Sequence, residues 1–305
     1  MRTITLFLCA ALAVTSIDAA SYQKINGTIV MPILDTDGNV LAYSGNNLEP
    51  SAQLRFADLT SADLTDANLD SADLRNTNLT DANLTGANLT GAHLSDSLLF
   101  GFSANLTNAN LTGASLSHAY LQYANLSYAN LTDANLDSAD LRQADLTDAN
   151  LDSADLDSAD LQLADLEGAI LTDANCTGAS LYRANLPDAI LIDANLTGTS
   201  LTVANLRYAN LSDADLSDAW LYDADLTGAN LSGLILTDTK YYTDATWTDA
   251  FYYTDNEPTW RSGMDAAWRT SVGILALAPT SAVPEPAAIL LALFGLALLP
   301  RRRRK

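Results

Sequence analysis

Basic residues, histidine and cysteine are scarce in this chain. It has 15 lysine and arginine residues against 37 aspartate and glutamate residues, a formal net charge of −22. Such a surface repels nucleic acid, whose phosphates need basic partners, so the charge argues against a nucleic-acid partner. The two histidines, His93 and His118, are 25 residues apart in sequence and fit neither a metal-site spacing nor a nucleophile–histidine pair. The sequence therefore predicts a protein that is not an enzyme and has no cofactor.

Aromatic residues are also few, at 7% of the chain. A low aromatic content with a high net charge is typical of disordered chains. A strict internal repeat offers a different explanation. Leucine recurs every fifth residue from Leu54 to Leu99 and again from Leu106 to Leu236, with Cys176 as the one exception in the second block. Self-similarity at a fixed period predicts a solenoid rather than a disordered chain.

The repeat unit is exemplified by Ala129-Asn130-Leu131-Thr132-Asp133. A period of five fits neither an α-helix nor a flat strand. Only the leucine and the alanine two residues before it are consistently apolar, so we expect these two to point inward. The three polar positions suit tight corners, because Asp, Asn, Ser and Gly form turns.

Runs of this unit resemble the pentapeptide-repeat family over residues 53–239. The resemblance implies an all-β fold, a right-handed quadrilateral β-helix with four pentads in each coil and roughly nine coils in total. At Cys176 a leucine position holds a thiol, which we expect to be buried and unreactive. A spacing of seven between Leu99 and Leu106 predicts a two-residue insertion within residues 100–103.

The two flanks of the repeat predict end structures. Ile29 to Leu34 and Val40 to Tyr43 surround a turn-forming run, so residues 21–52 are interpreted as a hairpin that covers the first coil. Residues 240–282 contain most of the tryptophans and are interpreted as an aromatic cap over the last leucines, since bare solenoid ends aggregate. The alternative for this aromatic segment is a patch that stacks on sugars.

Both ends of the chain carry sorting features. Residues 1–20 read as a signal peptide, with Arg2, an apolar run from Ile4 to Val14, and small residues Ala19 and Ala20 before the cut. If this segment and its Cys9 are removed, Cys176 is left as the single cysteine and no internal disulfide can form.

The C-terminal segment 283–305 resembles a PEP-CTERM sorting signal. The motif Val283, Pro284, Glu285, Pro286 precedes an apolar stretch and a basic end, Arg301 to Lys305. The resemblance implies processing by an exosortase, a transient membrane anchor and export to the bacterial cell surface, with signal peptidase acting at the other end. A simple tail anchor is the alternative, although the apolar stretch is short for a span.

Stacking residues twenty apart sorts the repeat into four faces, and one face differs from the rest. We predict that it contacts a partner or a second copy, because Tyr, Trp and Arg are enriched at interfaces. The alternative is drift at exposed positions. The predicted residues are Tyr120, Tyr123, Arg142, Leu163, Tyr182, Arg183, Trp220 and Tyr222.

These observations favour an exported structural or adhesive rod, with envelope or matrix polysaccharide or a surface protein as its partner. The alternative is a specific protein-binding module that uses an acidic, DNA-mimic-like surface or the Tyr/Arg face. Stacked pairs such as Asp140 with Asp160 could bind Ca²⁺ weakly, but a solvated surface is favoured because a tight site needs six or more converging oxygens. The oligomeric state and the fate of the C-terminal segment stay open.

Overall fold

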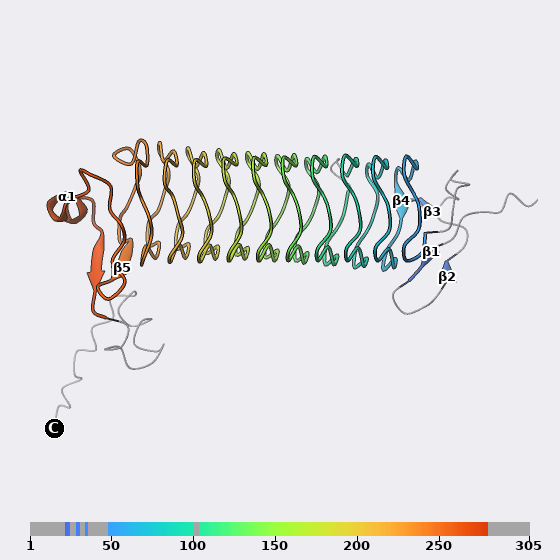
Figure 1. Cartoon of the computed structure of the whole chain (residues 1–305), viewed down its shortest axis with the longest axis horizontal. Helices are drawn as coiled ribbons and strands as arrows, with labels where there is room; N and C mark the ends of the chain where they lie inside the picture. Colours follow the sequence, from blue (N-terminus) through green and yellow to red (C-terminus); the bar gives the residue numbers. More distant parts are fainter. Residues whose placement is uncertain (1–21, 25–28, 31–33, 36–47, 100–103, 280–305) are drawn as a thin grey trace, which may run out of the picture.

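The computed structural model describes residues 22–24, 29–30, 34–35, 48–99 and 104–279. The chain winds into a rod of stacked coils, with its N-terminal strands at one end and its only described helix at the other (Figure 1). Regular elements are short because each side of a coil is only a few residues long. They are β1 (Tyr22–Gln23), β2 (Ile29–Val30), β3 (Leu34–Asp35), β4 (Ala62–Asp63), β5 (Phe251–Tyr253), α1 (Ala266–Ser271) and β6 (Leu275–Leu277).

Neighbouring coils are joined by parallel bridges between residues twenty apart in sequence. Asn105 pairs with Asn125, which in turn pairs with Asp145. The leucine amide donates along the rod axis, as from Leu136 to the carbonyl of Asp155 at 2.6 Å. The twenty-residue spacing confirms that four pentads make one coil.

Each pentad turns a corner through hydrogen bonds that explain its consensus. The Ala134 amide donates to the Leu131 carbonyl at 3.0 Å, and the intervening Asp133 has a φ of 56°, as the third residue of a type II turn requires. The side chain of Asn130 accepts from both the amide and the hydroxyl of Thr132, at 3.2 and 2.7 Å. An Asn or Asp before the leucine and a Thr or Ser after it therefore hold the corner together.

The interior of the rod is a column of leucine and alanine side chains. Leu136 and Ala134 are 0% exposed, and the pattern continues through the described coils. This confirms the inward direction predicted for both residues. Thr199 replaces an alanine, and its hydroxyl donates to the Cys176 carbonyl at 2.7 Å, so the polar group is satisfied inside the core. Cys176 is buried, as predicted. This burial raises the pKa of its thiol to about 12, which keeps it protonated.

The coil register absorbs the insertion between the two repeat blocks. Asn78 pairs with Leu98, twenty residues on, whereas Asn83 pairs with Asn105, twenty-two residues on. After the insertion the spacing returns to twenty. The two extra residues are therefore accommodated without rotating the later coils, and residues 100–103 themselves lie outside the described part of the chain.

At the N-terminal end, short strands pair with the first coils. β1 and β2 form an antiparallel pair, β3 pairs antiparallel with β4, and Lys24 forms an antiparallel bridge with Ala67. The predicted hairpin partner Val40 to Tyr43 lies outside the described residues, as does the turn before it, so that hairpin stays a prediction. The segment's antiparallel pairing with the repeat was not expected from the sequence.

At the C-terminal end, the coil spacing widens and aromatic residues pack on the last coil. Ile235 pairs with Thr259, and β5 pairs in parallel with β6. Trp247 is 1% exposed, and the buried Tyr252 belongs to the same core cluster. Asp265 begins α1 by accepting from the Trp268 amide at 2.8 Å.

No helix in the described ranges is long and apolar enough to cross a membrane. The predicted signal peptide (1–20) and sorting segment (283–305) both lie outside those ranges. Their roles therefore stay predictions.

Candidate contact face

All eight residues predicted for the contact surface lie on one face of the rod. The bridges run in a single ladder from Leu98 through Tyr120 and on to Trp220 and Lys240. Beside this ladder run two corner columns, which hold the residues one and two positions after the buried leucine. We call the eight residues the contact strip: Tyr120, Tyr123, Arg142, Leu163, Tyr182, Arg183, Trp220 and Tyr222.

The strip exposes large apolar groups to solvent. Tyr120 is 46% exposed, Leu163 49% and Trp220 44%. Val203, which is 38% exposed, lies in the same corner column as Tyr123 and Leu163. The strip is therefore a continuous line of side chains rather than a scatter of single exposed residues.

Tyr241 extends the strip and was missed from the sequence as a contact residue. It is 50% exposed, and its ring lies 5.7 Å from that of Trp220 and 6.1 Å from that of Tyr222. Sequence reasoning assigned Tyr241 to the aromatic cap because the repeat ends just before it. The signal that could have found it is Lys240, which stands twenty residues after Trp220 and continues the ladder.

In the corner column two positions after the leucine, the backbone conformation of bulky residues costs free energy. Tyr123, Leu163 and Val203 have φ values of 63°, 60° and 60°, in the left-handed region. Bulky and β-branched residues are disfavoured there by about 1–2 kcal/mol each. Most corners on the other faces hold Asp, Ser, Asn or Gly, as at Asp133, Ser153 and Gly168. In the corner column that begins at Tyr123, five consecutive coils hold residues that do not favour the left-handed conformation. They are Tyr123, Gln143, Leu163, Arg183 and Val203.

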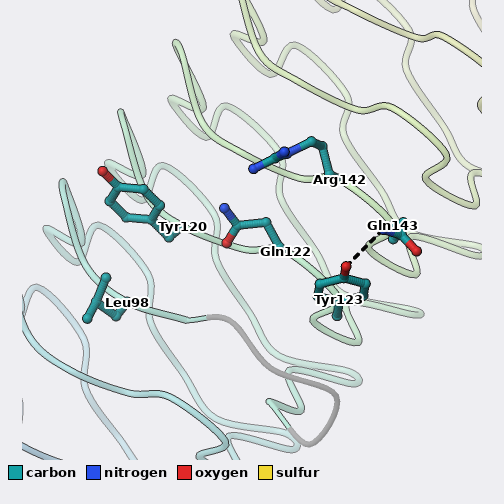
Figure 2. A pocket seen from close by; sticks show the side chains of 6 residues that line it. All are labelled: Leu98, Tyr120, Gln122, Tyr123, Arg142 and Gln143. Atoms are coloured by element: carbon teal, nitrogen blue, oxygen red, sulfur yellow. Dashed lines mark hydrogen bonds between the residues drawn. The ribbon is translucent and has the colours of Figure 1, made fainter.

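A hollow of about 450 Å³ opens at the N-terminal end of the strip (Figure 2). Its walls come from successive coils, and the Gln143 side chain donates to the Tyr123 hydroxyl at 3.0 Å at one edge of it. Aromatic rings and amide groups therefore meet in one concave site. The lining residues are Leu98, Tyr120, Gln122, Tyr123, Arg142 and Gln143.

Arg142 is fixed in place by carboxylates on two coils. Its guanidinium donates two hydrogen bonds to Asp140, at 2.8 and 2.6 Å, and lies 3.6 Å from a carboxylate oxygen of Asp160. Gln122 also donates to Asp140. Desolvation raises the pKa of Asp140, but the hydrogen bonds from Arg142 and Gln122 outweigh it and leave that pKa below its ordinary value. The carboxylate stays ionised and holds the Arg142 fork beside the hollow.

Charges on the strip face are balanced, unlike those of the chain as a whole. Arg183 lies 5.1 Å from the centre of the Tyr182 ring, and Lys240 lies 5.9 Å from that of Trp220. The bridge ladder and the two corner columns from Tyr120 to Lys240 hold three basic and three acidic residues. They are Arg142, Arg183 and Lys240 against Asp140, Asp160 and Asp223. Lys240 also pairs with Asp218 of the neighbouring corner at 3.0 Å.

Two other exposed tyrosines lie on a different face. Tyr128 and Tyr208 are 57% and 56% exposed and share one corner column, separated by three coils with Asp or Gly at that corner. The Tyr208 ring covers Gly228 so closely that a Cβ there would lie 2.4 Å from it. Arg207 lies 5.6 Å from the centre of the Tyr208 ring. The ring pairs among the described residues include neither Tyr128 nor Tyr208, so the two tyrosines provide controls for the aromatic groups of the strip.

Among the described residues no group of three or more His, Cys, Asp or Glu side chains is placed to hold a metal ion. Asp140 and Asp160 do stack as predicted, but Arg142 lies within ion-pair distance of both. Weak Ca²⁺ binding elsewhere on the acidic surface stays a prediction.

The stacked pentads and their buried leucines define a β-solenoid built from five-residue units. The family of pentapeptide repeats matches the chain in eight copies, over residues 52–99, 102–137, 134–173, 169–207 and 204–240. These ranges include more than half of the sequence. The chain therefore belongs to the pentapeptide-repeat family, and the resemblance found in the sequence is confirmed.

Similar solved structures include other members of this family. HetL, a pentapeptide-repeat protein involved in heterocyst differentiation regulation in Nostoc sp. strain PCC 7120, is 38% identical, with 65% of this chain and 87% of HetL covered and a TM-score of 0.43. QnrB1, a plasmid-mediated fluoroquinolone resistance protein, is 19% identical, with 69% and 96% covered and a TM-score of 0.48. No curated protein sequence matches this chain.

Proposed function

We propose that this chain is an exported, non-enzymatic rod that holds the contact strip against a partner at the cell surface. The observation that carries the proposal is the run of bulky residues at left-handed corners on one face. Neutral drift under selection for stability would favour Asp, Asn or Gly at such corners. Residues that combine a strained backbone with an exposed apolar side chain are typical of functional surfaces.

The rest of the surface suits a structural or adhesive role. A net charge of −22 keeps copies of the rod apart and soluble, while the strip is balanced in charge and can approach another surface without repulsion. Rigidity comes from the coil-to-coil hydrogen bonds, which fix the spacing of strip residues along the axis. The rod thus presents its contact groups at defined intervals.

The second candidate is a specific protein-binding module, in which the contact strip or the acidic faces bind one protein partner. Trp, Tyr and Arg on the strip favour it, since these residues dominate protein interfaces. Self-association and partner binding by purified protein distinguish this alternative from adhesion to a matrix.

The two sorting features support export of the rod, and they are tested by cell fractionation with mass measurement of the mature protein. We expect the protein at the cell surface or outside the cell, with a mass that lacks residues 1–20 and the segment after the Val283–Pro286 motif. A cytoplasmic protein of full-length mass would overturn export and would favour the protein-binding module.

Replacing Val203 with asparagine should raise stability and weaken contact at the same time. Asparagine tolerates the left-handed corner, so the free energy of unfolding should rise by about 1 kcal/mol. The matched control is Asp193→Asn, at a corner with a φ of 56° on another face, which should change neither property. Denaturant unfolding measures the free energy of unfolding, and retention of the protein on its partner surface measures the strength of the contact. A Val203→Asn protein that is less stable than wild type would remove the strain argument.

A further inference from the structure

The shape of the strip constrains what can occupy it. Tyr120 and Trp220 are five coils apart, which at a strand spacing of about 4.8 Å is about 24 Å along the axis. The three outward residues of one side span about 10 Å across it. This gives an area of about 240 Å², whereas a specific protein interface covers about 800 Å² on each partner. The strip therefore fits a narrow, extended chain better than a globular protein.

Backbone hydrogen bonding excludes one kind of extended chain. The corner amides on this face are already used between coils, as from Tyr123 to the Arg142 carbonyl at 3.1 Å and from Arg183 to the Thr202 carbonyl at 3.0 Å. A peptide strand that binds by adding to a sheet edge needs free amides and carbonyls. Recognition at these corners must come from side chains.

The side chains on the strip suit hydroxyl-rich rings. Tyr120 and Tyr123 stand at the hollow, and Trp220, Tyr222 and Tyr241 form a second aromatic group farther along. Such rings present an apolar face with a polar edge, which matches the alternating apolar and hydroxyl surfaces of a sugar. At the hollow, Arg142 and Gln143 offer fixed hydrogen-bonding groups, and the balanced charge does not demand a charged ligand.

We propose that the contact strip binds a neutral, linear polysaccharide that lies parallel to the rod axis, with one sugar ring in the hollow at Tyr120, Tyr123 and Arg142. This inference rests on the contact role proposed above and names its ligand class. The aromatic group at Trp220 and Tyr241 holds the same chain further along, so two stacking sites share one ligand. Binding at both sites on one rigid rod raises the avidity for long chains over short ones.

The test is affinity electrophoresis of the full chain in native gels that contain one glycan each. Hydroxyethylcellulose, dextran and galactomannan are the neutral probes, and polygalacturonate is the acidic one. We expect retardation by at least one neutral probe and none by polygalacturonate. The double variant Tyr120→Ala/Trp220→Ala should weaken the apparent affinity at least about tenfold, because it removes a stacking ring from each site. The matched control Tyr128→Ala/Tyr208→Ala should match wild type.

Three results would overturn the inference: no retardation by any neutral probe, retardation by the acidic probe alone, or an equal loss in the two double variants. Sedimentation of the same proteins shows whether only polysaccharide binding has failed or the contact role of the strip has failed as well. If wild type binds no glycan but self-associates, and the strip variant does not, the strip is a contact face for a second copy. If neither property depends on the strip, the contact role fails as well.

Discussion

Replacing Trp247 with alanine should lower the free energy of unfolding by about 3–5 kcal/mol. Trp247 is 1% exposed and is the largest fully buried side chain among the described residues. Its Nε1 donates to the Tyr242 carbonyl at 2.9 Å, and its ring packs edge-on against Trp268 at 6.0 Å. The alanine variant loses the packing and leaves that carbonyl without its donor. Chemical denaturation followed by circular dichroism measures the loss.

The control for this prediction is Trp220→Ala, which removes the same side chain at a 44% exposed position on the strip. It should cost no more than about 1 kcal/mol. Because a solenoid is stabilised by contacts between neighbouring units, the Trp247→Ala protein should lose structure first at its C-terminal coils. Equal losses in the two variants would mean that the aromatic segment does not protect the end of the rod.

The second large effect is expected from Leu156→Ala in the middle of the rod. Leu156 is 0% exposed, and the next coil places Cys176 at the same position of the interior column. Removal of its side chain leaves a cavity that the neighbouring coils cannot fill, because each coil is tied to the next through its backbone. We expect a loss of about 2–5 kcal/mol in denaturant unfolding.

Asp157→Ala, one residue along, is the matched control for Leu156→Ala. Asp157 points outward and its carboxylate accepts only from Ser158, at 3.2 Å, among the contacts described. Its replacement should change stability by less than about 0.5 kcal/mol. An Asp157→Ala protein as unstable as Leu156→Ala would contradict the inward direction of the leucines.

Much of the repeat could be predicted from the sequence because its geometry is local and periodic. A leucine and an alanine in each pentad must be buried together, and the resemblance to the pentapeptide-repeat family implies four pentads in each coil. The same arithmetic aligned Tyr120 with Trp220, although they are a hundred residues apart. The two-residue insertion before Leu106 was readable because it broke the period without ending it.

The features outside the period were not predictable in this way. Tyr241 joins Trp220 only because the chain continues for one more corner after the repeat pattern ends, and no spacing rule covers that corner. The pairing of β3 with β4 joins a non-repetitive segment to the first coil, which depends on tertiary contact rather than local pattern. The hollow at Tyr123 depends on side-chain directions across three coils, which sequence periodicity does not specify.

The alignment of the strip is the claim on which the functional account depends, and it can be measured directly. Spin labels at positions 120 and 220, in a chain with Cys9 and Cys176 replaced by alanine, report the separation by pulsed dipolar spectroscopy. We expect a single distance near 24 Å, which is five coil rises along one face. A broad distribution, or a distance clearly above about 35 Å, would show that the two aromatic groups do not share a face and would contradict a common ligand.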